Sequence, residues 1–383
     1  MVVKRYTENV GRSQVDYLSD LVARACTVPY FEHGRNYRSD VHVKISNGEL
    51  SIGGHVATPK KINYKGIARQ IIDQSGYRRT GDIPKGLPSI RTSVDTQRVD
   101  EAERINIEHG VGDSGHGRGW ATNETIQGVR KSTIIARELA NGFDNIASDR
   151  RYGKLGPDLK VNCVFDYSDS GEFIGLSSAT IAIQHRKNVT HKHVTDIVKT
   201  LTHTALAVAD IPHDSDRIKV NCAGKFVTGG PVADAGHSNA RISYQTYGEL
   251  DLLPFQESFW GRSPEKDSIV WPLWARHVAR NIVTAGLADQ CQVWYACDIG
   301  STNVKEIGIR GLKPEADKDK VIDFVRDKFG YKVKDVIENL DLYNPGNYPP
   351  ELITHGIFGS GLDLPWERTV LKKDDSDLLE LWR

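Results

Sequence analysis

A glycine-rich segment in the second half of the chain combines three kinds of group that recognise nucleotides. It reads Gly224-Lys225-Phe226-Val227-Thr228-Gly229-Gly230-Pro231, and Asp234 follows shortly after. An aromatic ring stacks on a base, a lysine binds phosphate, and a carboxylate accepts hydrogen bonds from hydroxyl or ammonium groups. The segment therefore favours a nucleoside phosphate as ligand, although a surface β-turn is the more common structure for such a segment taken alone.

The densest group of glycines is Gly110–Gly119, in which five of ten residues are glycine. So many glycines allow the backbone to approach a ligand closely. The spacing of Gly110, Gly112 and Gly115 matches a dinucleotide fingerprint, but that fingerprint follows a strand and the preceding residues are poor strand formers. Gly112-Asp113-Ser114-Gly115 also matches the sequence around the serine of trypsin-like proteases, but a helical pattern follows it instead of disulfide-rich β structure. Neither match assigns a function by itself.

Other common site motifs are absent from the sequence or weak. There is no Walker A motif, and no cysteines and histidines stand at the spacing of a zinc site. His185, His191 and His193 lie in a polar, basic stretch, which is more typical of solvated histidines than of metal ligands. A metal site built from histidine or cysteine is therefore not expected.

The composition is that of a globular protein without a strong field of one sign. The 383 residues contain 50 Lys and Arg against 50 Asp and Glu, which argues against nucleic-acid binding by bulk positive charge. No stretch approaches the ~18 apolar residues that span a bilayer, and no apolar signal-peptide core is present, so no membrane partner is expected. The five cysteines are odd in number and scattered, which favours reduced thiols and a cytoplasmic location.

Segments with helical and strand patterns alternate along the chain. The expected helices are Tyr64–Gln74, Thr125–Ser148, His193–Ala209, Ser268–Asp289, Lys318–Phe329 and Val333–Leu340. The expected strands are Val41–Lys44, Glu49–Ile52, Leu159–Tyr167, Phe173–His185, Lys219–Cys222, Arg241–Gln245, Gln292–Ala296 and Val304–Arg310. Residues 77–115 are polar and poorly periodic, as in a lid or linker. The pattern predicts an α+β fold of three similar modules, residues 1–103, 104–220 and 221–383.

Taken together, the motifs resemble those of the methionine adenosyltransferases, or S-adenosylmethionine synthetases. The family's Gly-Ala-Gly-Asp-Gln-Gly hexapeptide is similar to Gly110–Gly115, and its Gly-Arg-Phe-Val-x-Gly-Gly-Pro segment is similar to Gly224–Pro231. Further similar segments are Ala121–Thr125, Pro157–Lys160, Gln184-His185, Thr246–Gly248, Val278–Asp289, Phe358-Gly359 and Pro365–Glu367. These segments follow the family's order over most of the chain, so the chain is identified as a member.

The resemblance implies three interleaved α+β modules and a homodimer, or a dimer of dimers, with active sites at the subunit interface. It implies that the sulfur of L-methionine attacks C5′ of ATP and forms S-adenosylmethionine. The triphosphate is then hydrolysed to phosphate and diphosphate before release. Mg²⁺ and K⁺ are the implied cofactors, because a leaving group with about four negative charges requires cations fixed around it.

The resemblance also implies roles for individual residues. The expected catalytic residues are Lys160, Arg12, Arg241 and Lys266. The expected ATP-binding residues are Asp113, Asp158, Lys160, Lys225, Phe226, Asp234, Arg241 and Arg262. The expected methionine-binding residues are Asp234, His55 and Lys266. The expected metal ligands are Asp16 and Asp267, or its neighbour Ser268, for Mg²⁺ and Asp40 for K⁺.

Four segments depart from the family's pattern. The family's Gly-His-Pro-Asp-Lys is shortened to Gly11–Asp16, where Arg12 and Asp16 are the candidates to replace the histidine and the aspartate. The methionine-binding Gly-Gly-Glu is Gly53-Gly54-His55, and an imidazole does not pair with an ammonium as a carboxylate does. The phosphate loop is Glu257–Ser263, where Glu257 and Trp260 replace small residues, and Ala240 replaces an arginine.

These departures leave two alternatives to S-adenosylmethionine synthesis open. His55 in place of the glutamate favours a homologue that adenosylates another nucleophile. The changed phosphate loop and the changed segment Gly11–Asp16 favour a non-catalytic paralogue that binds nucleotide or regulates an active partner.

Overall fold

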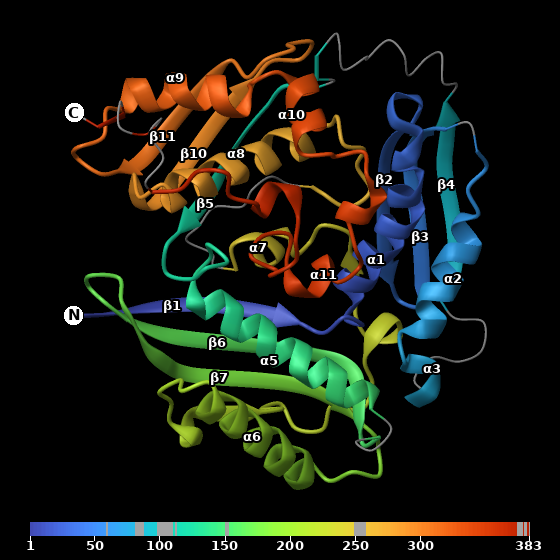
Figure 1. The fold of residues 1–383 in the computed structure, drawn as a ribbon. Helices are drawn as coiled ribbons and strands as arrows, with labels where there is room; N and C mark the ends of the chain where they lie inside the picture. The colour runs from blue at the N-terminus through green and yellow to red at the C-terminus, as the bar shows by residue number, and fades with distance from the viewer. Residues whose placement is uncertain are drawn as a thin grey trace.

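The computed structural model describes residues 1–58, 60–80, 88–97, 110–111, 113–149, 153–248, 258–373, 378 and 381–382. Within these residues, three β-sheets surround a central group of short helices (Figure 1). Helices cover one face of each sheet, so the predicted α+β class is confirmed.

The sheet at the bottom of Figure 1 has the strand order β1-β6-β7-β8. β1 (Val2–Val10) pairs antiparallel with β6 (Leu155–Ser168), which pairs antiparallel with β7 (Phe173–His185), and the short β8 (Ile218–Val220) runs parallel to β7. α5 (Lys131–Ser148) and α6 (His191–Val208) pack on one face through apolar side chains. Alternate residues of β6, among them Val161, Cys163 and Phe165, point into this core, so Lys160 points to the other face.

The second sheet has the order β4-β3-β2-β9. Its strands are β2 (Arg38–Ser46), β3 (Glu49–Ala57), β4 (Ser89–Gln97) and β9 (Gly236–His237). Val41, Val43 and Ile52 are buried on the face that packs against α1 (Val15–Thr27) and α2 (Tyr64–Gln74). The alternate residues, which include Asp40, His42, Lys44, His55 and Asp95, form what we call the polar face of this sheet.

The third sheet, order β11-β10-β5, consists of β5 (Gly115–Thr122), β10 (Ala288–Cys297) and β11 (Glu306–Leu312). α8 (Asp267–Thr284) lies across β5 and β10, with α9 (Lys318–Phe329) and α10 (Val333–Asn339) nearby (Figure 1). A Cβ on Gly119 would lie 2.1 Å from the carbonyl carbon of Ala275 in α8. At least this member of the glycine group Gly110–Gly119 therefore serves helix packing, and Gly112 lies outside the described residues.

Between the sheets lie α7 (Ile242–Thr246) and α11 (Leu352–His355) (Figure 1). An ion pair that includes the fully buried Arg276 also joins the central elements. Arg276 of α8 donates from Nε and Nη2 to the two carboxylate oxygens of Glu367, both at 2.9 Å. Its remaining donors bind the backbone carbonyls of Trp120, Gln127 and Gly128.

Each sheet takes a strand from a distant part of the chain. β1 joins strands that begin at Leu155, β5 joins strands that begin at Ala288, and β9 joins the sheet of β2, β3 and β4. This exchange agrees with the interleaved modules that the sequence predicts. The boundaries at 103 and 220 stay a prediction.

Some predicted elements are wrong. Arg241–Gln245 is not a strand, because Ile242–Thr246 forms α7, in which Ile242, Gln245 and Thr246 are buried at helical spacing. The helix expected from Thr125 begins at Lys131, after a turn in which Gly128 has φ 66°. Residues 77–115, expected to lack regular structure, contain β4, which runs parallel to β3.

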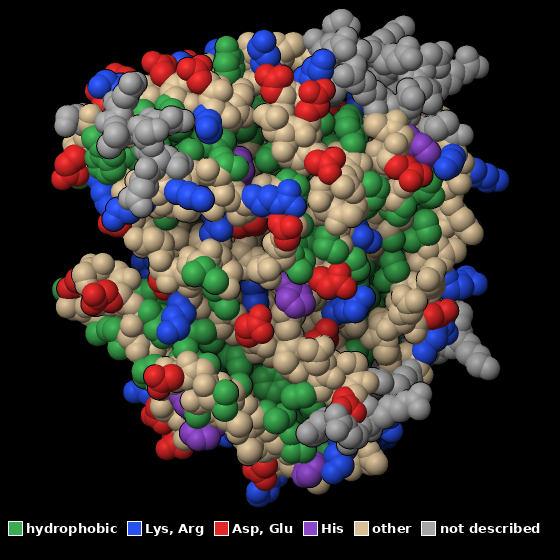
Figure 2. All heavy atoms as spheres, viewed as in Figure 1, with side chains coloured by type: hydrophobic (Ala, Val, Ile, Leu, Met, Phe, Trp, Pro, Cys, Tyr) green, Lys and Arg blue, Asp and Glu red, His purple; other side chains and the backbone are tan. Residues whose placement is uncertain are grey.

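Charges of both signs are mixed over the face seen in Figure 2. None of the helices in the described ranges combines the length and the apolar character needed to cross a bilayer.

Candidate functional site

Four charged side chains from four elements meet where β1, β6, α1 and α7 come together. Arg241, at the N-terminus of α7, donates from Nε to Asp16 Oδ2 at 2.7 Å and also pairs with Glu8 of β1. Glu8 Oε2 lies 2.6 Å from Lys160 Nζ. Burial opposes the charge of Arg241, but Glu8 and Asp16 outweigh it and raise the guanidinium pKa. We call Glu8, Asp16, Lys160 and Arg241 the first charged cluster.

The first turn of α1 positions Asp16. Gln14 is the N-cap residue, and its Oε1 accepts a hydrogen bond from the Asp16 N–H at 2.8 Å. Asp16 lies in the first helical turn, where the helix dipole favours an anion. Its Oδ1 accepts from the His237 N–H at 3.1 Å, and a Cβ on Gly236 would lie 2.4 Å from the same oxygen. Both carboxylate oxygens of Asp16 are therefore engaged.

One turn further along α1, the fully buried Asp20 ties the helix to its neighbours. Its two oxygens accept from the Asn239 N–H at 2.6 Å and from Gln245 Nε2 at 2.7 Å. Gln245 Oε1 in turn accepts from Trp260 Nε1 at 2.7 Å. Burial raises the pKa of Asp20 to about 8, although both hydrogen bonds oppose that shift. Trp260, which the sequence placed in the phosphate loop, is therefore a core residue.

The nucleotide-type segment Gly224–Pro231 packs against the ends of β6 and β7. Asp158 Oδ2 accepts from the Gly230 N–H at 2.8 Å, and burial raises the Asp158 pKa to about 6. The His185 N–H donates a hydrogen bond to the Phe226 carbonyl oxygen at 2.8 Å. Gly230 has φ 67°, and a Cβ there would lie 2.3 Å from Cζ of Tyr77. The segment is therefore packed into the molecule and is more than a surface turn.

The other expected ligands of this segment face solvent. Lys225 is exposed, Phe226 is half-buried and Asp234 is exposed. Asp234 Oδ2 lies 3.5 Å from Gln14 Nε2, and Gln14 also caps α1. The segment and the first charged cluster are therefore connected through one side chain.

A second charged cluster lies at the edge of the polar face and consists of Asp40, His42, Arg262 and Lys266. Arg262 pairs with Asp40, and its Nη2 lies 3.2 Å from His42 Nε2. Lys266 Nζ lies 3.6 Å from Asp40 Oδ2. Burial lowers the Arg262 pKa, and the nearby charge of Asp267 opposes that shift. Glu257 of the same loop lies outside the described residues.

A hollow of about 460 Å³ on the polar face borders both clusters. His42 belongs to the second cluster, and the backbone of His237 holds Asp16 of the first. The hollow is lined by His42, Val43, Lys44, Ser51, Gly53, His237 and Ser238. Lys160 and Arg241 meet in the first charged cluster, and Arg262 and Lys266 meet in the second. That the four cations surround one polyphosphate stays a prediction.

His55 lies on the polar face but opens onto a separate hollow. It stands opposite Asp40 on one side and Asp95 on the other in the registers of β2, β3 and β4. His55 Nδ1 lies 3.6 Å from Asp95 Oδ2, and both side chains are exposed. Their hollow has a volume of about 520 Å³.

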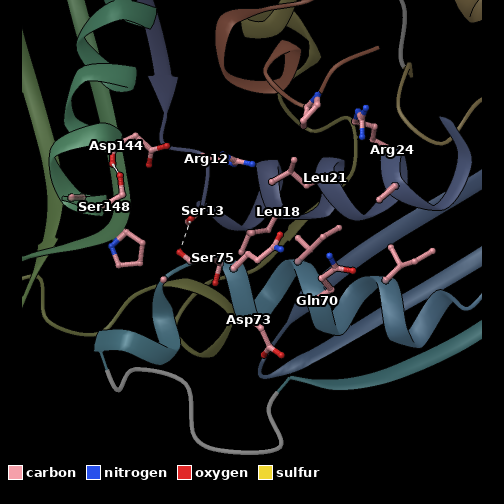
Figure 3. A pocket seen from close by; sticks show the side chains of 18 of the residues that line it. Arg12, Ser13, Leu18, Leu21, Arg24, Gln70, Asp73, Ser75, Asp144 and Ser148 are labelled. Atoms are coloured by element: carbon pink, nitrogen blue, oxygen red, sulfur yellow. Dashed lines mark hydrogen bonds between the residues drawn. The ribbon is translucent and has the colours of Figure 1, made fainter. Parts of the chain in front are cut away.

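Arg12 and Asp113 are not brought to the charged clusters by any contact among the described residues. Arg12 lies beside Asp144 and lines a cavity of about 910 Å³ between α1, α2 and α5 (Figure 3). Leu18 and Leu21 of α1 line the same cavity, whereas Asp16 and Asp20 of α1 bind the elements on its other side. Asp113 is exposed at the start of β5, where its Oδ1 accepts from the Ser114 N–H at 2.8 Å.

Two of the expected metal-binding carboxylates, Asp16 and Asp40, are paired with arginines. No group of three or more His, Cys, Asp or Glu side chains that could hold a metal occurs in the described part of the chain. Asp16 is engaged by Arg241 and the His237 N–H, and Asp40 is engaged by Arg262. A guanidinium and a metal ion compete for the same carboxylate lone pairs, so these carboxylates already have their cations.

Glu8 and Gln14 are site residues that the sequence did not predict. Glu8 meets Lys160 only through the register of β1 with β6, in which Val10 stands opposite Lys160 and Glu8 opposite Asn162. Such a pairing joins residues about 150 positions apart and has no local signal. Gln14 had only a weak signal, because Asp16 suits the first turn of a helix but glutamine is not among the preferred N-cap residues.

Comparison with known families assigns most of the chain. The S-adenosylmethionine synthetase central domain matches residues 108–226, and the C-terminal domain of the same enzymes matches residues 228–368. The first range contains Asp158 and Lys160, and the second contains Asp234, Arg241 and Lys266. Together the two ranges cover roughly two thirds of the 383 residues, in the family's order. The chain therefore belongs to the S-adenosylmethionine synthetase family.

Proposed function

We propose that this protein forms S-adenosylmethionine from ATP and L-methionine and releases phosphate and diphosphate after hydrolysis of the bound triphosphate. The observation that carries this assignment is the approach of Lys160 and Arg241 to each other through Glu8, next to Asp158 and Asp234. Family membership supports the reaction class.

The adenosine half of ATP is assigned to the segment Gly224–Pro231 and its neighbours. The half-buried ring of Phe226 packs against adenine, and Lys225 supplies a nearby cation. The exposed carboxylate of Asp234 accepts hydrogen bonds from the ribose hydroxyls or from the methionine ammonium. Asp158 holds the Gly230 N–H and so fixes the backbone on which these side chains stand.

In the first step, a sulfur lone pair attacks C5′ while the bond from C5′ to the triphosphate oxygen breaks. No proton moves, so the chain lowers the barrier by stabilising the charge that develops on the leaving oxygen. Lys160 and Arg241 carry that role, with Lys266 and Arg262 at the far end of the triphosphate. Lys160 has a side chain that is 45% exposed, which lets it turn from Glu8 toward an entering phosphate.

Mg²⁺ and K⁺ are the cations that the family generally uses, and the expected ligands for them are Asp16, Asp267 or Ser268, and Asp40. Because Asp16 and Asp40 are engaged by Arg241 and Arg262, we assign the leaving group's charge to the protein's own cations. Arg12 keeps its expected catalytic role only as a prediction, because it lines the cavity in Figure 3.

The active enzyme is proposed to be a homodimer or a dimer of dimers. His55 and Asp113 are expected at the site, yet each lies away from the first charged cluster within one chain. A second copy that faces the polar sheet would supply both residues to the cluster of the first copy. Sedimentation of the purified protein tests this arrangement, and a monomer that is fully active would contradict it.

Incubation with ATP, L-methionine, Mg²⁺ and K⁺ tests the function directly. We expect S-adenosylmethionine by mass spectrometry, together with phosphate and diphosphate. Absence of the product at high enzyme concentration would falsify the assignment. Release of triphosphate from ATP by the purified homodimer, or of the phosphate and diphosphate formed from it, would exclude a non-catalytic paralogue.

A second candidate function is adenosylation of a different nucleophile, and the observation that favours it is His55. The imidazole lies 3.6 Å from Asp95 and offers no carboxylate to an ammonium group. A screen of thiols and thioethers with ATP would reveal such a substrate. If only methionine is consumed, this candidate is excluded, and His55→Glu is then expected to lower the KM for methionine.

A further inference from the structure

The guanidinium of Arg262 fills a polar position beside Asp40. It pairs with Asp40, its Nε lies 3.1 Å from Ser258 Oγ, and its Nη2 lies 3.2 Å from His42 Nε2. A carboxylate and a hydroxyl oxygen are the kinds of ligand that a hard cation takes. Ser268 Oγ, which lies 3.5 Å from Ser258 Oγ, adds another oxygen nearby.

The backbone fixes Arg262 in this position. The Val41 N–H donates to the Gly261 carbonyl at 2.9 Å, and Asp40 and Arg262 form a β-bridge. Gly261 has φ 90°, and a Cβ there would lie 2.0 Å from the Val41 carbonyl oxygen. The loop therefore lies directly on β2, and the Arg262 side chain is only 13% exposed.

The charges around Asp40 disfavour binding of a further cation there. Asp40 is the carboxylate of this position, and Arg262 and Lys266 already supply two positive charges to it. The neighbouring Glu265 is engaged by Arg38 at 2.9 Å and by Ser263. Asp267 also acts on Arg262, so it balances one of these charges. A monovalent metal ion would add a third positive charge next to two carboxylates. Like charges this close repel one another even though the Asp40 and Lys266 side chains are about one-third exposed.

We propose that Arg262 is the resident cation of this position and stands where the family's pattern implies K⁺ at Asp40. Arg262 then neutralises Asp40 at the edge of the polar face, and nucleotide binding there needs no monovalent metal ion. The nucleotide-binding and activity readouts below rest on the proposed function, and the thermal-unfolding readout does not.

The first test compares thermal unfolding of the full-length protein in KCl, NaCl and choline chloride at equal ionic strength. The wild-type Tm is expected to be the same in the three salts. Arg262→Met removes the charge and keeps most of the apolar stem, so Asp40 faces a vacated, oxygen-lined position. Its Tm is expected to fall in choline and to recover specifically in K⁺.

Three further variants complete this test. Arg262→Lys keeps one cation and is expected to show no response to K⁺. Asp40→Asn combined with Arg262→Met removes the charge that would attract K⁺ and should abolish the recovery. Arg326→Met is the matched control, because it deletes an exposed arginine of α9 that lies 3.5 Å from Asp323. A wild type stabilised by K⁺ over choline, or an Arg262→Met variant without a K⁺ response, overturns the proposal.

Nucleotide binding and turnover give a second readout. Wild-type affinity for a non-hydrolysable ATP analogue should change less than about twofold when choline replaces K⁺, because the cation is built in. Arg262→Met should bind on the order of tenfold more weakly in choline, because Asp40 loses the cation that is paired with it, and should regain affinity in K⁺. If no S-adenosylmethionine forms, the proposed function fails, while the Tm results still decide the role of Arg262. If Arg262→Met does not fold, the wild-type protein decides the question. Wild-type binding of the ATP analogue that depends on K⁺ would then overturn the proposal.

Discussion

Arg241 Nε and Asp16 Oδ2 lie 2.7 Å apart and join the N-termini of two helices, α1 and α7. The contact pairs Arg241, which is expected to bind phosphate, with Asp16, which is expected to bind a metal ion. The four charges of the first cluster therefore balance one another. Under the proposed function, an entering polyphosphate would have to displace the carboxylates from Arg241 and Lys160.

The Asp16–Arg241 pair is expected to stabilise the fold measurably. A double-mutant cycle of Asp16→Asn and Arg241→Met should give a coupling free energy of about 1–3 kcal/mol in urea unfolding, because both side chains are largely buried. The same cycle on the exposed Asp323 and Arg326 of α9 should give roughly 0–1 kcal/mol. Equal couplings for the two pairs would contradict this expectation.

Lys160 and Arg12 are expected to differ in their effect on turnover. Lys160→Ala removes a cation from the leaving group and should lower kcat by about 10²–10³. Arg12→Ala alters the wall of the cavity between α1, α2 and α5 and should change kcat by less than about fivefold. Steady-state rates of S-adenosylmethionine formation measure both. A large loss from Arg12→Ala would restore the catalytic role that the sequence assigns to it.

Stability is expected to fall as the pH rises from about 6.5 to about 8. The folded state holds a proton on Asp20, whose pKa is raised to about 8 by burial, whereas the unfolded state releases it at about 4. Asp158, raised to about 6 by burial, acts in the same direction up to pH 6, whereas the buried His277, whose pKa is lowered to about 4, acts in the opposite direction up to about pH 6.5. Above pH 6.5 the Asp20 contribution remains, so the free energy of unfolding should be larger at pH 6.5 than at pH 8.

Asp20→Asn isolates the part of this pH dependence that belongs to Asp20. The variant should show a flatter dependence between pH 6 and pH 8, whatever its absolute stability. Asp323→Asn, on the surface of α9, should keep the wild-type slope. An unchanged slope in Asp20→Asn would show that Asp20 is ionised throughout this range.

Gly230 is expected to tolerate substitution less well than a glycine of similar φ in open space. In Gly230→Ala the new Cβ meets the ring of Tyr77, which donates to the Ser13 carbonyl at 2.7 Å. Gly171→Ala is the matched control, since Gly171 has φ 86° and nothing within 4 Å of its ideal Cβ. The control should lose about 1 kcal/mol of stability and Gly230→Ala at least about 2 kcal/mol more. Urea unfolding of both variants measures the difference, and equal losses would mean that the Tyr77 ring moves freely.

The buried Arg276–Glu367 pair is expected to be essential for the central elements. Glu367→Ala leaves the fully buried Arg276 without its carboxylate and should lower the free energy of unfolding by about 3–5 kcal/mol. Replacing both residues by apolar ones of similar size should recover part of this loss. Chemical unfolding curves of the single and double variants decide between these outcomes.

Local periodicity was sufficient for β6, β7, α6 and α8, because each has a continuous apolar face. It was insufficient for β1, whose inward-facing residues are polar. Thr7 donates to the Gly248 carbonyl, and Asn9 donates to the Thr354 carbonyl at 3.3 Å. These partners lie more than 200 residues away, so the strand has no hydrophobic alternation that a sequence pattern could reveal.

The same distinction applies to the candidate site. Asp158, Lys160 and Gly230 lie in motifs with a recognisable local sequence and are found together. Glu8 reaches Lys160 only through strand pairing, and Arg262 reaches Asp40 only because the loop lies on β2. Contacts that depend on the pairing of distant segments cannot be recognised from the neighbouring residues in one sequence. The pairing of carboxylates with arginines could therefore not be predicted.

The pairing of β1 with β6 has a consequence for biosynthesis. Val10 stands opposite Lys160, so β1 has no partner in β6 until about 150 more residues have been made. At about 5–20 residues per second this wait lasts roughly 8–30 s, during which an unpaired strand edge is exposed. Nascent chains of this protein are therefore expected to need protection by a chaperone until β6 has emerged.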